Sequence, residues 1–265
     1  MHDRATRGAH GAAPLNLSRS FRPTINPPLL TLNLMKSFFI FLSLSCAVLR
    51  MHAETNSIAW SGSATNAAGD TIATVTVDVS EVPELETWGE TAGKLCVEWY
   101  PKICDLLPGE GAVPARQVRL KFHKEMGGVA STSGHAINIS ANYVKGHTND
   151  FGMVVHELTH VVQDYGRRRN PGWLVEGVAD YIRIVHFEPA ARRPRIDPDK
   201  AKYTDAYKTT AIFLEWIEKK HDPETVKKLN RALRAGTFDV KLFEEISGKP
   251  LDDLWNDFTA SLRAR

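Results

Sequence analysis

The 265-residue chain is long enough for one domain of about 200 residues and a leader, and its 43% hydrophobic and 24% charged residues are typical of a soluble globular protein. Its formal net charge of +2 is misleading, because residues 1–53 hold six basic residues and only one acidic residue. The remaining 27 basic and 30 acidic residues give a net charge of −3, which argues against nucleic acid as a partner.

A leader is predicted at the start of the chain. Residues 1–34 carry no periodic pattern, so we interpret them as an upstream extension, either disordered or included by a start assigned too early. A lysine and an apolar run at 37–49 then indicate a signal peptide at 35–53, after which the mature protein would be secreted, extracellular or periplasmic. The run is too short for a spanning helix, so we expect no stable membrane span. Cys46 follows a poor lipoprotein cleavage pattern, which leaves lipid anchoring as a minor alternative.

Residues 54–265 are predicted to form one domain in which the strands come first. Alternating apolar and β-branched residues predict strands at 72–79 and 118–123, with a long helix at 81–107 between them. A third extended segment is predicted at 129–144, with a kink at its glycine. This segment could form a sheet edge beside a cleft and pair with an extended peptide, or it could be an ordinary sheet strand.

Two cysteines follow the leader, Cys96 and Cys104. An unbroken helix would place them about 12 Å apart along its axis, which is too far for a disulfide. Pro101 could break the helix between them, so a disulfide stays open as an alternative. We favour two buried thiols.

The sequence His-Glu-x-x-His at 156–160 is the signature of zinc hydrolases. On a helix, residues four apart share one face, so His156 and His160 can direct two imidazoles at one metal ion. Glu157 can then reach a water molecule at that metal. Capping residues at 148–150, an apolar stripe and Gly166 predict the beginning, the buried face and the end of such a helix. The alternative is a chance pair of histidines on a buried helix.

A second helix is predicted at 173–186, and its two acidic residues lie on one face. Glu176 and Asp180 are four apart among apolar residues, and buried carboxylates need partners. A role for Glu176 as a metal ligand, and for Asp180 as a hydrogen-bond acceptor for a ligand histidine, would satisfy both. With the two histidines, Glu176 would complete the three protein ligands of a catalytic zinc ion.

The rest of the chain is predicted to be helical after a loop at 190–202. The expected helices have apolar faces at helical spacing and lie at 205–220, 223–234, 240–247 and 251–262. The predicted fold class is therefore α/β, of the α+β kind: a zincin-like domain with a small mixed sheet, the metal-binding helix and a helical C-terminal half.

Longer stretches resemble known zinc peptidases. Trp-Leu-Val-Glu-Gly-Val-Ala at 173–179 resembles a motif of gluzincin aminopeptidases in which the glutamate is the third zinc ligand. The Glu-x-x-x-Asp at 176–180 is similar to that of thermolysin-like enzymes, where the aspartate supports a zinc-bound histidine. More closely, His-Glu-x-x-His-x-x-Gln at 156–163, followed by Pro-Gly-x-Leu-x-Glu-Gly-x-Ala-Asp-Tyr-x-Arg at 171–183, resembles the basic secretory protein family of plants and bacteria. The resemblance covers residues 70–262.

This resemblance implies a secreted peptidase that acts on peptide or protein substrates with Zn²⁺ as its cofactor. Glu157 would be the general base, and a hydrogen-bond donor must stabilise the oxyanion. Tyr207 is the first candidate for that donor and Tyr203 the second, while Tyr181 and His186 are weaker candidates. The alternative for each tyrosine is packing in the core with its hydroxyl satisfied.

Two other classes of protein stay open. One is a zinc-retaining, non-catalytic binding module at the cell surface or outside the cell, against which the intact Glu157 argues. The other is a structural zinc protein, which is disfavoured because only three protein ligands are apparent and a closed structural site takes four.

Overall fold

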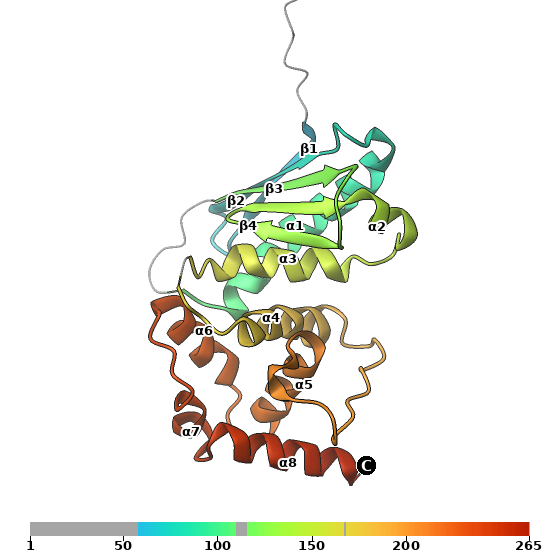
Figure 1. Ribbon diagram of the computed structural model, residues 1–265. Helices are drawn as coiled ribbons and strands as arrows, with labels where there is room; N and C mark the ends of the chain where they lie inside the picture. Colours follow the sequence, from blue (N-terminus) through green and yellow to red (C-terminus); the bar gives the residue numbers. More distant parts are fainter. Residues whose placement is uncertain (1–57, 110–115, 167, 265) are drawn as a thin grey trace, which may run out of the picture. The chain divides into compact units, whose positions relative to one another are not determined.

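A five-stranded mixed sheet forms one layer of the computed structural model, which describes residues 58–109, 116–166 and 168–264 (Figure 1). Its strands lie in the order β1-β2-β3-β5-β4. The outer pairs β1–β2 and β4–β5 are antiparallel, whereas β2, β3 and β5 run parallel. Their bounds are β1 Ile58–Thr65, β2 Thr71–Asp78, β3 Arg116–His123, β4 Ala130–Ser133 and β5 Ala136–Ser140.

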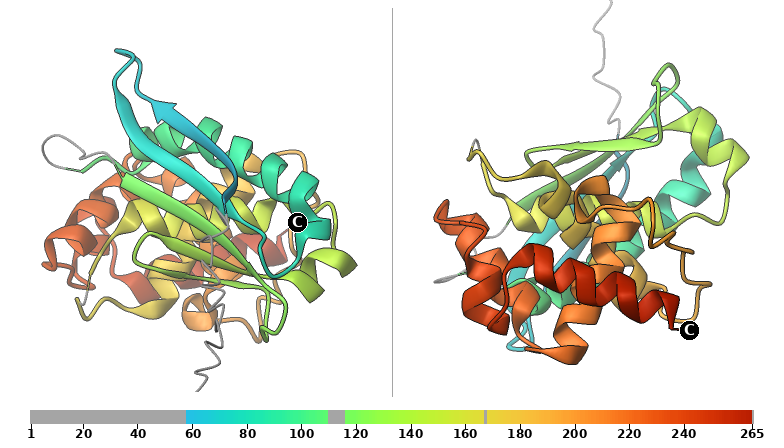
Figure 2. Two further views of the ribbon diagram at one scale, coloured as in Figure 1. Left: turned by 90° about the horizontal axis from the view of Figure 1, so that it is seen from above. Right: turned by 60° about the horizontal axis from the view of Figure 1, so that its bottom comes forward.

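The sheet buries one face against helices. In β3, Val118, Leu120 and Phe122 are fully buried, and they alternate with more exposed Arg119 and Lys121, as expected where one side of a strand faces a core. Helices α1 (Glu86–Leu106) and α3 (Gly152–Gln163) lie on this buried side (Figures 1 and 2). The predicted mixed α+β fold is therefore confirmed.

Strand β1 is missing from the sequence prediction, which begins the sheet at residue 72. The strand lies at an edge of the sheet, and Ala64 is its only buried residue. Because small and polar residues occupy most of its positions, it lacks the apolar alternation that identifies the inner strands.

The predicted extended segment 129–144 is instead a hairpin followed by a helix. Gly134, in a left-handed conformation with φ of +57°, lies in the turn between β4 and β5. Ser140 then caps helix α2 (Ala141–Gly146) by accepting a hydrogen bond from the N–H of Tyr143. The sequence analysis left open whether this segment is a sheet edge or an ordinary sheet strand. Its first strand, β4, is at the edge of the sheet and lies beside α3.

Helix α1 continues through Pro101, which does not end it. Cys96 and Cys104 are both free, as predicted, but only Cys96 is fully buried. A short 3₁₀ turn at Pro83–Leu85 precedes the helix.

The helices after the sheet form the C-terminal half of the fold. Helix α3 ends at Gln163 rather than at Gly166, because Asp164 adopts a left-handed conformation with φ of +39°. Helix α4 (Gly172–Tyr181) passes directly into the π-helical turn η2 (Ile182–Phe187), which together match the predicted helix at 173–186. The short turn η3 (Tyr203–Asp205) precedes four further helices, which are α5 Tyr207–Lys220, α6 Thr225–Ala235, α7 Leu242–Ser247 and α8 Leu251–Arg263.

Helix α4 is held between α3 and α5, with α8 beyond α5 (Figures 1 and 2). Gly177 allows the close approach of α4 and α5, because a β-carbon at this position would overlap the side chain of Thr210. This packing places one face of α4 opposite α3.

The predicted leader, with its signal peptide and Cys46, lies outside the described residues. Within the described ranges, no helix has both the length and the apolar character needed to cross a membrane.

Candidate metal centre

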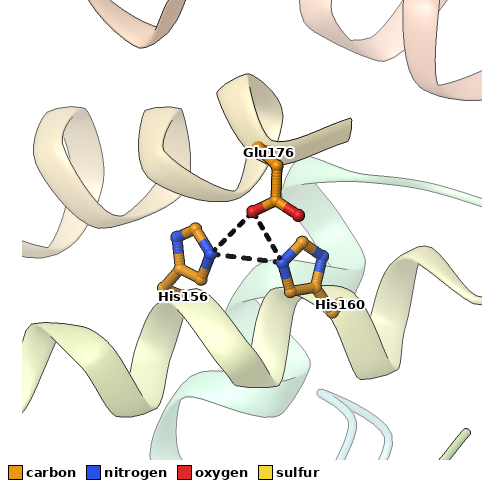
Figure 3. Close-up of side chains that lie close together, drawn as sticks. All are labelled: His156, His160 and Glu176. Atoms are coloured by element: carbon orange, nitrogen blue, oxygen red, sulfur yellow. Dashed lines mark hydrogen bonds and ion pairs between the residues drawn. The ribbon is translucent and has the colours of Figure 1, made fainter. Parts of the chain in front are cut away.

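Helices α3 and α4 bring three ligand-type atoms together. The Nε2 atoms of His156 and His160 are 3.2 Å apart, one turn from each other on α3. From α4, one carboxylate oxygen of Glu176 lies 3.2 Å from the first and 3.3 Å from the second (Figure 3). Four-residue spacing provides the histidine pair, and the packing of α4 on α3 supplies the third group.

The donor set fits a divalent metal ion. Ligands bound tetrahedrally to zinc at about 2.0–2.2 Å are about 3.3–3.6 Å from one another, which agrees with the separations found here. Two imidazole nitrogens and a carboxylate are the ligands of one common type of catalytic zinc site. Among the described residues, His156, His160 and Glu176 form the cluster that could hold a metal ion.

Hydrogen bonds hold the far nitrogen of each imidazole. The Nδ1–H of His156 donates to Asp180 at 2.8 Å, and Asp180 is buried. The Nδ1–H of His160 donates to the side-chain oxygen of Gln163 at 2.7 Å, while the amide nitrogen of Gln163 donates to the carbonyl of Val175 at 2.9 Å. In the neutral imidazoles that a metal ion requires, these partners hold the proton on Nδ1, so the lone pair of Nε2 is directed toward the cluster.

The position of Gln163 carries a role that the sequence analysis did not assign. In the sequence, Gln163 is only the last residue of the motif at 156–163. In the structure, its side chain connects His160 on α3 to Val175, the residue before Glu176 on α4. Its spacing of three from His160 places both on one helix face, which is the signal that could have identified it.

The carboxylates of Asp180 and Glu176 flank the imidazole of His156 and favour positive charge on it. Burial lowers the pKa of His156, but hydrogen bonds to Asp180 and Glu176 raise it more, to about 9. Burial raises the pKa of Glu176, but hydrogen bonds from His156 and His160 lower it more, to about 2. Glu176 is therefore ionised at neutral pH, as a metal ligand must be.

Glu157 lies beside the cluster but faces the edge of the sheet. It is one residue after His156, so the helix turns its side chain away from the ligand face. Its carboxylate oxygen Oε2 accepts a hydrogen bond of 2.7 Å from the hydroxyl of Thr132 on β4. Nothing in the sequence pattern connects Thr132 to Glu157, and the sequence analysis missed this contact.

A cleft with a volume of about 1270 Å³ contains the cluster. Its walls are β4 with the following turn, α3, α4 and the start of α5. At the N-terminal end of α3, Asp150 accepts hydrogen bonds of 2.7 Å from both Arg183 and the hydroxyl of Tyr143. At the C-terminal end of α3, the cleft is lined by Asp164 and Tyr165. The cleft thus extends along α3 to both sides of the cluster, as an extended chain would require.

Among the candidate oxyanion donors, Tyr207 lines this cleft. Its side chain is 55% exposed, and its ring centroid lies 6.2 Å from that of His156. The charge of Glu176, burial and the charge of Asp180 raise the pKa of Tyr207 above its ordinary value, so the hydroxyl keeps its proton. Both Ala206 and Tyr207 have left-handed φ values, of +61° and +43°.

The other candidate donors lie elsewhere. The hydroxyl of Tyr203 donates to Asp252 at 3.1 Å, and its ring packs against aromatic residues of the C-terminal half. The hydroxyl of Tyr181 donates to Glu218 and lies 3.2 Å from His186. These three side chains do not line the cleft, and the hydroxyls of Tyr203 and Tyr181 each donate to a carboxylate outside it.

Comparison with known protein families identifies the family of this chain. The chain matches the model of a family described as a peptidase of plants and bacteria, over residues 101–258. The match covers more than half of the chain, so the protein belongs to this family, and the resemblance to the basic secretory proteins is confirmed.

No curated protein matches the chain. Two crystal structures from Bacillus anthracis str. Ames, of a functionally unknown conserved protein and of its mutant, share 12% identity with it at TM-scores of 0.42 and 0.43. The matches cover 71% and 72% of this chain but 48% and 50% of theirs, so the chain spans about half the length of these structures.

Proposed function

We propose that the protein is a secreted, zinc-dependent peptidase in which His156, His160 and Glu176 hold the metal and Glu157 is the general base. One observation carries the proposal: three ligand atoms converge within 3.3 Å beside a further carboxylate. They do so in a cleft large enough for a peptide, in a member of a peptidase family.

Each residue of the site has a distinct task. A zinc ion held there would activate a water molecule and polarise the scissile carbonyl. Glu157 takes the proton from the water and passes it to the leaving amine. Because the hydroxyl of Thr132 occupies Oε2 of Glu157, the other oxygen, Oε1, is the one free to accept that proton. Asp180 and Gln163 keep the two imidazoles oriented.

Tyr207 is the proposed donor to the oxyanion. Its protonated hydroxyl can donate a hydrogen bond, and its position in the cleft next to His156 supports that role. The backbone of Ala206 and Tyr207 supports it further, because residues with side chains cost about 1–3 kcal/mol each in such conformations and tend to occur at functional sites.

The edge strand β4 indicates how a peptide would bind. The turn after β4 lies near the C-terminal end of α3, because His135 in that turn contacts Arg116, which donates to the carbonyl of Val161. Strand β4 therefore runs in the same direction as α3. A peptide paired antiparallel to β4 would place the residues after the cut over the beginning of α3, next to Asp150 and Arg183.

The proposed activity is tested by assaying the purified protein against a mixed peptide library in three states: zinc-loaded, chelator-treated and zinc-restored. We expect cleavage in the first and third states only, with one equivalent of bound zinc. His156→Ala should lose stoichiometric zinc and cleavage together. Full zinc loading without cleavage of any peptide would contradict the proposal and favour the non-catalytic binding module.

Export is tested separately. Mass spectrometry of the protein from its native source should find a mature N-terminus near residue 54, as a signal peptide at 35–53 requires. Recovery of intact residues 1–53 on a cytoplasmic protein would contradict secretion and leave the proposed catalytic site unaffected.

A further inference from the structure

We propose that Thr132 is a positioning residue that couples peptide binding at β4 to the general base. Its hydroxyl holds Glu157, while its main-chain groups are those that an incoming peptide would pair with. This inference rests on the proposed role of Glu157.

The side chain of Thr132 faces α3. Thr132 is partly buried, whereas its neighbours Ser131 and Ser133 are exposed, as the alternation of a strand requires. Its hydroxyl donates to Oε2 of Glu157 at 2.7 Å and also lies 3.0 Å from the carbonyl oxygen of the same residue. A threonine hydroxyl has one proton and its β-branch restricts rotation, so it makes a stiff, directional contact with the carboxylate.

The main chain of Thr132 faces the open edge of the sheet. The N–H of Ser140 donates to the carbonyl of Val129, so these opposite residues form a hydrogen-bonded pair between β4 and β5. Bonded and non-bonded pairs alternate along an antiparallel ladder, which makes Thr132 and Ile137 a non-bonded pair. The N–H and C=O of Thr132 therefore point away from β5, toward the side on which a peptide would add.

Both properties belong to one residue, which links two events in the cleft. A peptide that pairs with the main chain of Thr132 fixes this part of β4, and with it the hydroxyl that holds Oε2 of Glu157. Oε1 is then directed toward the reacting water. Thr132 keeps its own proton throughout, so its contribution is the orientation of the base and not proton transfer.

The first test compares zinc-loaded full-length Thr132→Val, Thr132→Ser and wild type. Valine preserves the shape and removes the hydroxyl, so kcat should fall on the order of 10–100-fold with KM changed less than about threefold. Serine restores the hydroxyl and should recover most of the activity. Thr74→Val, on the outward face of β2 and outside the cleft, is the matched control and should behave as wild type. Zinc content and melting temperature verify that each variant is folded.

The variants separate this inference from the proposed function. In the Glu157→Gln background, Thr132→Val should cause no further loss, because the base that it positions is already absent. If Glu157→Gln is inactive but Thr132→Val turns over like wild type, only the role of Thr132 is overturned. A serine variant as impaired as the valine variant would also overturn it. If Thr132→Val does not fold, Thr132→Ala takes its place in the comparison with Thr132→Ser.

The coupling itself is tested with substrates methylated at one main-chain nitrogen at a time. Methylation at the position that pairs with Thr132 should lower kcat as well as raise KM for wild type. The same methylation should leave the kcat of Thr132→Val nearly unchanged. If methylation at every position changes only the KM of wild type, main-chain pairing and positioning of Glu157 are independent, and the proposed coupling is overturned.

Discussion

Gln163 offers a sharp test of how the site is held together, because its two hydrogen bonds can be removed separately. Its side-chain oxygen orients His160, and its amide nitrogen donates to the carbonyl of Val175 on α4. Gln163→Ala removes both. Gln163→Glu keeps an acceptor for His160 but sets a carboxylate against the carbonyl of Val175.

The expected magnitudes follow from the burial of this side chain, which is 2% exposed. Each lost hydrogen bond costs about 0.5–1.5 kcal/mol, and a buried carbonyl left without a donor costs about 1–3 kcal/mol. Both variants should therefore destabilise the metal-free protein. Zinc affinity should fall about 10–100-fold in Gln163→Ala, as is usual when the partner of a ligand histidine is lost. In Gln163→Glu it should fall less, because His160 keeps its acceptor.

Chelator competition measures zinc affinity, and thermal unfolding of the metal-free proteins measures stability. Gln117→Ala, at an exposed glutamine of β3, is the matched control and should change neither. If Gln163→Ala binds zinc as tightly as wild type, the orientation of His160 by Gln163 is refuted. Equal affinity losses in both variants would instead assign the effect to the contact with Val175.

Three further outcomes are expected. Asp180→Asn should weaken zinc binding about 10–100-fold in the same competition assay, because a ligand histidine loses its charged acceptor, and an unchanged affinity would contradict this role. Gly177→Ala should destabilise the protein by about 1–3 kcal/mol in urea unfolding through overlap with α5. Gly172→Ala, where a new β-carbon meets nothing within 4 Å, should be nearly neutral, and equal effects would argue against the close packing of α4. Tyr207→Phe should lower turnover on the order of 10²–10³-fold with zinc retained, whereas full turnover would remove it as the oxyanion donor.

The parts of the site that lie on one helix were predictable from spacing. A four-residue interval places His156 and His160 on one face of α3, and the same interval relates Glu176 to Asp180 on α4. Each pair needs only the geometry of a single helix. That the two pairs meet depends on the packing of α4 on α3, which spacing within one helix does not give. The sequence analysis joined them because a catalytic zinc ion takes three protein ligands, and the family resemblance agreed.

The contact between Thr132 and Glu157 was not predictable in this way. It joins residues 25 positions apart, on a strand and a helix, through a hairpin that the sequence analysis took for one extended segment. The turn residues Gly134 and His135 lack the strong Asn-Gly type of hairpin signal. Tyr203 also depends on tertiary packing, because this residue is close in sequence to the cleft but contacts Asp252 and Trp255 on α8.

The measurement that tests the central claim most directly compares peptide hydrolysis and bound zinc in wild type and Glu157→Gln. Glutamine preserves the size of the side chain and the acceptor for Thr132 but cannot take the proton from water. We predict one equivalent of zinc in both proteins and a loss of hydrolysis on the order of 10³-fold or more in the variant, with Glu90→Gln, at an exposed acid of α1, as an active control. Equal hydrolysis by wild type and Glu157→Gln would contradict the account, because the activity would then arise without the proposed general base.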